Sequence, residues 1–459
     1  MSESAVESVS GKTDKYDLTR GSILAKLLRM SIPAIGSQLV HMAYSFADMF
    51  WLGRISSGAV AASGTVGIFL WLSMSFDVFG SKGAEIGIAQ NLGRGEYETA
   101  RGFLHTSMFL ALTLGILCGA GFFLFRNGLI GFFHIQEAEV SSAAVTYLAI
   151  VALGIPFTYI NSVLTSAFNA SGNSALPFYV NLICLAGNAI LDPILITTAN
   201  MGIAGAAWAT SFCQILACVF MLIALKRYKH PAFVRVRLWG KPKLEMLKRI
   251  ARWGTPLAFE SFCFTFFVII VSRFVAGFGS NAMAVQRIGN QVDQFSYLIS
   301  AGFGSALSAF IGQNFGAERF DRISSGFRMS TAIMSVWGVL ATLNLLFFGR
   351  FFFTLFVPNE PTVINMGVEY LRIIMMCQIV ASLEGVGTAV FRGLGETLYP
   401  AVISISTNVL RVALAFFLSR TSLAQNGIWL AMAISAFLRG AGAYLFSIPT
   451  LRKQNKRLT

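Results

Sequence analysis

The sequence predicts an all-α integral membrane protein of about twelve transmembrane helices, arranged as two six-helix bundles. Three observations predict this fold class. Only 12% of the 459 residues are charged and 55% are hydrophobic, whereas soluble domains carry about 25% charged residues. Twelve apolar runs are long enough to cross a bilayer. The second half of the chain also repeats landmarks of the first half at a shift of 223 residues.

Polar, Gly and Pro clusters divide the chain into apolar runs of about the 20 residues that a membrane crossing needs. The second and eighth runs are longer than a bilayer requires, which indicates tilt or protrusion. The expected spans are 31–53, 64–90, 102–125, 139–165, 175–198, 203–225, 252–277, 283–313, 327–356, 365–391, 399–420 and 427–449.

These spans define the domain organisation. Residues 1–30 are expected to form a cytoplasmic tail, because their first 22 residues are polar and lack the apolar core of a cleaved signal. We expect an N-lobe at 31–225, a basic cytoplasmic linker at 226–251, a C-lobe at 252–449 and a cytoplasmic C-terminal tail at 450–459. The six cysteines show no metal-type spacing.

The net charge of +14 has a clear distribution along the chain. Twenty-five of the 35 Lys and Arg residues fall in the tails and in the loops on the N-terminal side of the membrane, and ten of these lie in 226–252. The opposite side holds only Arg54, Arg126, Arg350 and Arg420. This positive-inside bias places both termini in the cytoplasm of a cell inner membrane, and it gives no reason to expect nucleic acid as a partner.

The internal repeat indicates a transporter. At a shift of 223, Pro33 aligns with Pro256, Gln90-Asn91 with Gln313-Asn314, and Gly93 with Gly316. The register slips by two near the end, where Gly202-Ile203 aligns with Gly427-Ile428. Since an even number of spans separates the copies, both halves enter the membrane in the same direction. Parallel repeats of this kind are typical of secondary transporters.

Two carboxylates at membrane depth are the first functional candidates, because a charge near the bilayer centre costs roughly 3 kcal/mol. Asp48 lies in the outer part of span one and Asp192 lies in span five, four residues after Asn188 and therefore on the same helix face. If the two spans pack together, these groups converge, with Thr210 on span six as a further oxygen ligand. Such a pair either takes up a proton or holds a cation such as Na⁺.

Structural alternatives remain open for each of these residues. Asp48 could face water at the outer interface, and Asp192 could stabilise a kink before Pro193. Asn188 and Thr210 could form ordinary interhelical hydrogen bonds. Under the repeat, Val271 and Ala415 replace the two carboxylates, so the second half lacks the pair. Its own candidates are Glu260, Asp293, Glu384 and Arg411, of which Glu384 and Arg411 could neutralise each other as an ion pair.

The chain resembles the multidrug and toxic compound extrusion (MATE) family of the multidrug/oligosaccharidyl-lipid/polysaccharide exporter superfamily. The resemblance covers nearly the whole chain and rests on the order of several short motifs. These are IPAIGSQLV and the later AD in span one, the QNLGRG and QNFGAE loops, and the turns NASGN and RGLGET, each followed by a proline. The LDP segment of span five is similar to the DinF-type branch.

The resemblance implies particular roles for residues of the N-lobe. It implies a coupling-cation site at Asp48, Asn188, Asp192 and Thr210, a substrate chamber lined by Tyr147 and Tyr44, and a bend of helix one at Pro33. The C-lobe departs from the NorM-type pattern, because Phe264 and Ala381 stand where that pattern has Glu and Asp.

These features predict a cation-coupled antiporter, driven by H⁺ and/or Na⁺, that exports amphipathic, cationic or polyaromatic compounds as a monomer and without a cofactor. A flippase for lipid-linked oligosaccharide is the alternative. It would need cations in the central cavity for a pyrophosphate, and Arg273, Arg287 and Arg411 are few and scattered. An enzyme is not expected, because the four histidines form no metal-binding motif.

Overall fold

The computed structural model describes residues 16–456 except 136, 229, 231–232 and 234–241. All regular structure in this part of the chain is helical. It contains twelve helices long and apolar enough to cross a membrane, which confirms the predicted fold class.

Each lobe contributes six of these spans. The N-lobe consists of α2 (Ile23–Ile55), α3 (Ser57–Gly93), α4 (Tyr97–Gly131), α5 (Ala138–Ala170), α6 (Ala175–Pro193) continued by the π turn η1 (Ile194–Thr198), and α7 (Gly202–Arg227). The C-lobe consists of α8 (Leu244–Ala276), α9 (Ser280–Gly316), α10 (Phe320–Phe356), α11 (Pro361–Ile374) joined through the 3₁₀ turn η2 (Met375–Cys377) to α12 (Gln378–Leu394), α13 (Leu398–Leu418) and α14 (Gln425–Lys456).

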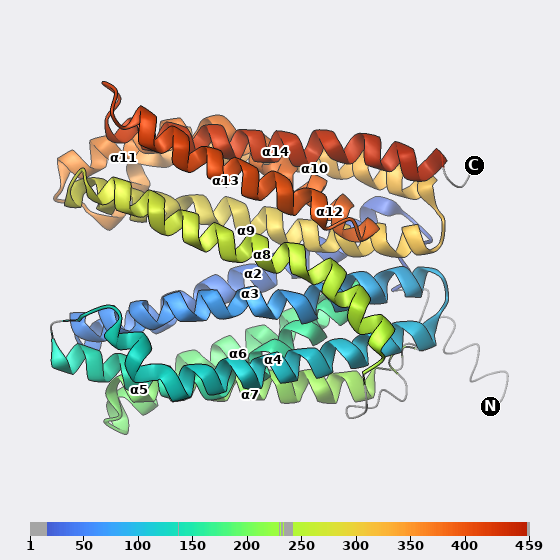
Figure 1. Ribbon diagram of the computed structural model, residues 1–459, viewed down its shortest axis with the longest axis horizontal. Coiled ribbons are helices and arrows are strands. Elements are labelled where there is room, and N and C mark those ends of the chain that lie inside the picture. The colour runs from blue at the N-terminus through green and yellow to red at the C-terminus, as the bar shows by residue number, and fades with distance from the viewer. Residues whose placement is uncertain (1–15, 136, 229, 231–232, 234–241, 457–459) are drawn as a thin grey trace.

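The two lobes lie side by side, with their helices running along a common long axis (Figure 1). The N-lobe is coloured blue to green and the C-lobe yellow to red. The start of α2 and the end of α14 lie at the same end of the molecule, which we call the termini end. Most of the contact between the lobes is made by α2 and α3 on one side and by α8 and α9 on the other.

The helices extend well beyond the predicted spans. The longest have 37 residues, about 55 Å, against a hydrocarbon thickness of about 30 Å. The helices begin seven or eight residues before the predicted spans at α2 (Ile23), α3 (Ser57), α8 (Leu244) and α10 (Phe320), and α14 continues seven residues beyond, to Lys456. Charged residues near these helix ends, such as Lys26 and Arg29, interrupt an apolar run without interrupting a helix.

The first turns of α2 and α8 are exchanged between the lobes. Leu27 of α2 is fully buried in the C-lobe core beside Phe310. Ile250 of α8 is fully buried in the N-lobe core beside Phe103. Leu27 and Ile250 are equivalent under the 223-residue repeat, so the exchange follows the internal symmetry of the chain.

The lobes approach each other closely near the termini end, where α3 meets α9. A Cβ atom added to Gly93 would lie 1.9 Å from the carbonyl oxygen of Gln313, and one added to Gly316 would lie 1.9 Å from that of Gln90. Any other residue at either position would push the two helices apart. The repeated glycines of the QNLG and QNFG motifs therefore permit direct contact between the two backbones.

Candidate functional site

Asp48 lies on α2, about two turns before the end of the helix, and is partly exposed. The hydroxyl of Thr210 on α7 donates a hydrogen bond to its Oδ2 atom at 3.3 Å. The hydroxyl of Tyr44, one turn earlier on α2, donates to the backbone carbonyl of Thr210 at 3.4 Å. These two contacts attach α2 to α7 at the level of the carboxylate.

Asn188 and Asp192 project from α6 into the same region, and both are completely buried. The Asn188 amide donates to Asp192 Oδ1 at 3.3 Å. With the amide in the orientation in which both of its ends find partners, its nitrogen donates to Asp48 Oδ1 and Asp192 Oδ2, each at 3.2 Å, and its oxygen accepts from Tyr44 at 3.2 Å. A single amide nitrogen then contacts both carboxylates.

The local sequence explains why α6 can present this pair. Proline cannot donate the backbone hydrogen bond of a regular helix, and α6 ends at Pro193, directly after Asp192. The chain continues as a π turn over Ile194–Thr198, and the Thr197 hydroxyl donates to the Pro193 carbonyl. Such π segments occur often at functional sites because they change the direction of side chains.

The arrangement suits a small hard cation or a proton. Carboxylate, amide and hydroxyl oxygens are the ligands that such cations prefer, and two adjacent carboxylates in low dielectric do not both stay ionised without a neutralising charge. Within the described residues there is no group of three or more His, Cys, Asp or Glu that could hold a metal ion. The oxygen ligands of this cluster therefore fit a proton or Na⁺ better than a transition metal.

A small cavity of about 20 Å³ borders the cluster on the side of the termini end. This volume is about enough for one water molecule. Sequence reasoning did not identify it, because neutral polar residues are common in membrane helices. Its lining consists of Val40, His41, Tyr44, Asn181, Cys184, Cys213, Gln214 and Ala217.

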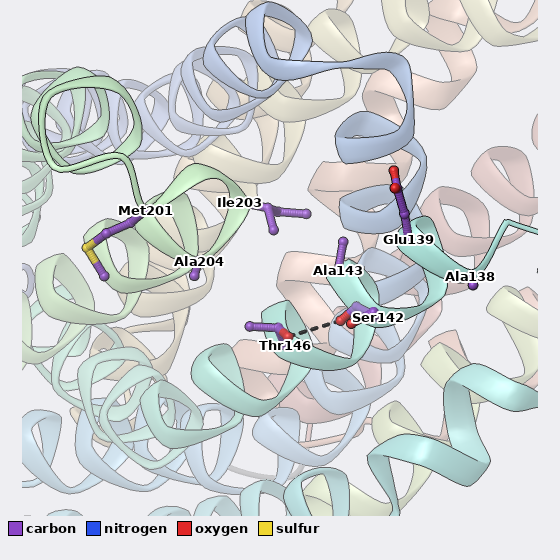
Figure 2. A pocket seen from close by; sticks show the side chains of 8 residues that line it. All are labelled: Ala138, Glu139, Ser142, Ala143, Thr146, Met201, Ile203 and Ala204. Carbon is purple, nitrogen blue, oxygen red and sulfur yellow. Dashed lines mark hydrogen bonds between the residues drawn. The ribbon is translucent and has the colours of Figure 1, made fainter.

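A larger and more open hollow of about 600 Å³ lies at the end opposite the termini, between the first turns of α5 and α7 (Figure 2). Glu139 is its only charged lining residue, and Thr146 donates to the carbonyl of Ser142 at 3.0 Å on its α5 wall. Tyr147, one of the two predicted chamber residues, follows Thr146 directly. Its ring is buried in the apolar cluster of Leu52 and Ile196 rather than in this hollow.

Asp77 of α3 is an ionisable residue at membrane depth that sequence reasoning did not single out. Its Oδ2 atom accepts a hydrogen bond of 2.6 Å from Ser162 on α5, whereas its Oδ1 atom is buried without a hydrogen-bond partner. The signal for this residue was present in the sequence, since a carboxylate within a span is rare.

The C-lobe candidates differ from the N-lobe cluster because arginines lie among their carboxylates. Glu384 pairs with Arg439 at 2.9 Å, so the predicted pair with Arg411 is wrong. Asp293 accepts from the Gln378 amide at 2.6 Å, and Arg411 donates from Nε to Ser435 at 2.7 Å. Glu260 on α8, one turn after a proline, lies near this ion pair, because it interacts electrostatically with Glu384 and Arg439.

The repeat explains this difference between the lobes. At a shift of 223, Arg411 occupies the position of Asn188, and at the later shift of 225, Ser435 occupies that of Thr210. The positions of Asp48 and Asp192 hold Val271 and Ala415, which are buried in an apolar cluster. The C-lobe therefore has the permanent positive charge of Arg411 at this position. The N-lobe has groups there that could bind a coupling cation.

Two six-helix lobes in parallel repeat, with a polar cluster buried at membrane depth in one of them, define a membrane transporter and not an enzyme. A family model described as MatE matches residues 33–194 and 256–417, once in each lobe. The chain belongs to this MATE family of transporters.

Two relatives are similar to the chain in sequence, and one solved structure is similar to it in fold. The chain is 25% identical over 430 residues to "Probable multidrug resistance protein NorM" of Thermotoga maritima, covering 92% of each chain. It is 26% identical over 433 residues to "Probable multidrug resistance protein YoeA" of Bacillus subtilis, covering 92% of this chain and 93% of the relative. A structure of a multidrug resistance MATE transporter in an outward-facing conformation superimposes with a TM-score of 0.88 at 20% identity, covering 96% of this chain and 98% of that chain.

Proposed function

We propose that this protein is a secondary antiporter in which inward flow of H⁺ and/or Na⁺ drives the export of amphipathic, cationic or polyaromatic compounds. It acts as a monomer in the cell inner membrane, with the termini end in the cytoplasm. Two facts support this orientation and cargo. The sequence assigns twenty-five basic residues to the side of the termini and four to the other side, and related chains are named as multidrug resistance proteins.

The observation that carries the proposal is the sharing of the Asn188 amide nitrogen by Asp48 and Asp192, at 3.2 Å each. With both carboxylates ionised, the cluster presents negative charge to a cationic substrate. Entry of a proton or Na⁺ neutralises the pair and weakens that attraction. Substrate and coupling ion then compete for one site, which is the simplest chemical basis for exchange.

The available driving force is sufficient for export. Each pH unit across the membrane contributes about 1.4 kcal/mol, and one charge crossing 100 mV contributes about 2.3 kcal/mol. Together these correspond to roughly a few-hundred-fold accumulation for each proton exchanged.

The experiment that tests the proposal measures efflux of a fluorescent cationic dye from cells that lack other efflux pumps. We expect Asp48→Asn and Asp192→Asn each to reduce efflux at least about tenfold, because each removes a titratable group from the cluster. The matched control is Asp321→Asn, which changes an exposed carboxylate at the start of α10. Efflux at the wild-type rate in both cluster variants would show that the coupling site lies elsewhere.

The coupling ion is identified separately in proteoliposomes with either a pH gradient or a Na⁺ gradient imposed. The oxygen atoms of two Asp, one Asn and one Thr side chain can bind either ion. Each gradient is therefore imposed on the wild type and, as a control, on Asp48→Asn. The ion whose gradient alone drives dye transport in the wild type, and not in this variant, is the coupling ion.

A further inference from the structure

The segment Tyr16–Ser22, which precedes α2, crosses the seam between the lobes at the termini end. Its role rests on the proposed function, because an antiporter must open and close this end in each cycle. It was expected to be part of a polar tail, yet Leu18 is only 1% exposed. We refer to residues 16–22 as the strap.

The strap is anchored in the C-lobe through Leu18. Its side chain lies in the C-lobe core cluster with Phe310 and Ile323. Its backbone N–H donates to Gln313 Oε1 at 3.0 Å, and its carbonyl accepts from Asn314 Nδ2 at 3.2 Å. Side chain and backbone of one residue are therefore both held by α9 and its neighbours.

Arg322, at the start of α10, fastens the strap further. Only 9% of its surface is exposed. Its guanidinium donates to the carbonyls of Gly21 at 2.9 Å, Leu18 at 3.2 Å and Arg20 at 3.4 Å. Its Nε donates to Asn314 Oδ1 at 3.1 Å. Only the planar fork of arginine offers this many donors in fixed directions, and lysine does not replace it.

The other end of the strap contacts the N-lobe. The Tyr16 ring packs edge-on against Tyr228 at the end of α7, with centroids 5.7 Å apart. A Cβ atom at Gly172, in the turn between α5 and α6, would lie 2.3 Å from the Tyr16 carbonyl oxygen. Gly172 has φ +84°, so glycine here serves both the turn and the close approach of the strap.

Beneath the strap, two repeat-equivalent glutamines cross the seam in opposite directions. Gln90 of the N-lobe donates to the Gly393 carbonyl of the C-lobe at 2.9 Å. Gln313 of the C-lobe donates to the Ala170 carbonyl of the N-lobe at 2.7 Å. Since Gln313 also accepts from Leu18, one side chain joins the strap to the interlobe contact.

We propose that the strap, fastened by Arg322, holds the lobes together at the termini end and must be released before that end can open. Arg322 is then a positioning residue for the conformational step of transport, and it contacts neither substrate nor coupling ion. Opening requires withdrawal of Leu18 from the C-lobe core and loss of the Arg322 hydrogen bonds, so the strap favours the state in which this end is closed.

The test measures the distance between the lobes at the termini end, in the full-length protein without substrate or ion gradient. Spin labels are placed at Glu96, before α4, and at Ser324 on α10, both exposed, in a background without the six native cysteines. We expect Arg322→Ala and Leu18→Asp to raise the ratio of long to short distances about tenfold, which corresponds to about 1.4 kcal/mol. Arg322→Lys is expected to give an intermediate ratio.

The matched control is Arg319→Ala, which removes a neighbouring exposed arginine that pairs with Asp321. The variants are compared only as monodisperse protein, and two independent substitutions guard against a folding defect in one of them. Distance distributions of Arg322→Ala and Leu18→Asp that match the control would overturn the proposal. Because no transport is measured, this result is independent of whether Asp48 and Asp192 couple ions.

Discussion

Asn188 is the residue that allows two carboxylates to occupy one buried site. Its amide nitrogen donates to both carboxylates, and its oxygen can accept from Tyr44 or bind a cation. The same side chain can therefore form hydrogen bonds whether or not a cation is bound. A third aspartate at this position would add repulsion, and an aliphatic residue would leave Asp48 and Asp192 without a shared donor. We therefore regard the amide as the centre of the cluster.

Thr210 provides the most conservative test of the contacts around Asp48. Thr210→Val keeps the shape of the side chain but removes the 3.3 Å hydrogen bond to Asp48, whereas Thr210→Ser keeps the hydroxyl. A hydrogen bond to a charged group contributes about 1.5–3 kcal/mol, so dye efflux by the valine variant should fall about tenfold or more. The serine variant should retain most activity, and equal activity of both would remove Thr210 from the site.

Sequence reasoning identified the charged members of the site more readily than the neutral ones. Asp48 and Asp192 stand out because carboxylates within apolar runs are rare, and the i, i+4 spacing added Asn188. The neutral cavity residues carry no comparable signal, because their function depends on which helices pack together. Three of these side chains gave no usable pattern: His41, Asn181 and Gln214.

The burial of His230, in the linker after α7, leads us to expect that the thermal stability of the protein depends on pH. Burial lowers the pKa of His230 from its ordinary 6.5 to about 4, and its ring stacks on Tyr228 with centroids 5.7 Å apart. The folded protein thus favours the neutral ring. Below pH 6.5 the unfolded chain binds a proton more readily than the folded protein, so the free energy of unfolding decreases as the pH falls from 6.5 toward 4. On acidification from pH 7.5 to 5, the Tm of the wild type should fall more than that of His230→Phe. An equal fall in both would contradict this assignment.

At the scale of single elements, α2 belongs to both lobes. Its first turns, with Leu27, lie in the C-lobe core, and its later part carries Asp48 into the N-lobe. Pro33 stands just after the exchanged turns and interrupts the backbone hydrogen bonds of the helix there. A bend at this position would move the coupling cluster relative to the C-lobe anchor without disturbing either core.

This geometry predicts that Pro33→Ala impairs the conformational step more than binding. A continuous α2 resists bending, so turnover should fall about tenfold, equivalent to about 1.4 kcal/mol in the barrier. The substrate concentration at half-maximal rate should change little. Pro361→Ala is the matched control, because Pro361 is at the start of α11, where proline fits a helix without interrupting it. Unchanged turnover in Pro33→Ala would exclude the bend.

All twelve spans could be predicted because each apolar run is long enough to cross a bilayer. The positions of the helix ends could not be predicted in this way. Residues 23–30 include Lys26 and Arg29, so hydropathy alone assigns them to a tail, although Leu27 and Met30 are buried. Their burial depends on the exchange of helix starts between lobes, which is a tertiary feature. The strap was missed for the same reason.

At the scale of the whole molecule, the two lobes share a fold but not a chemistry. The N-lobe cluster can gain or lose a cation, while its repeat-equivalent position in the C-lobe holds the fixed guanidinium of Arg411 and apolar packing at Val271 and Ala415. Under the proposed function, the energy of moving one lobe against the other depends on whether the N-lobe cluster holds a cation.

Substitution of Glu384 tests whether the carboxylates of the C-lobe only stabilise the fold or also take part in ion coupling. Glu384→Gln leaves Arg439 without its partner at 2.9 Å, in a place where the two side chains are only 17% and 15% exposed. Loss of one partner of a buried pair costs about 3–5 kcal/mol, so the thermal stability of the purified protein should fall markedly. The double variant Glu384→Gln/Arg439→Gln should recover most of it. Dye transport by the folded fraction should still follow the ion gradient in the double variant, unlike in Asp48→Asn. Loss of this gradient dependence in a stable double variant would mean that the C-lobe takes part in coupling.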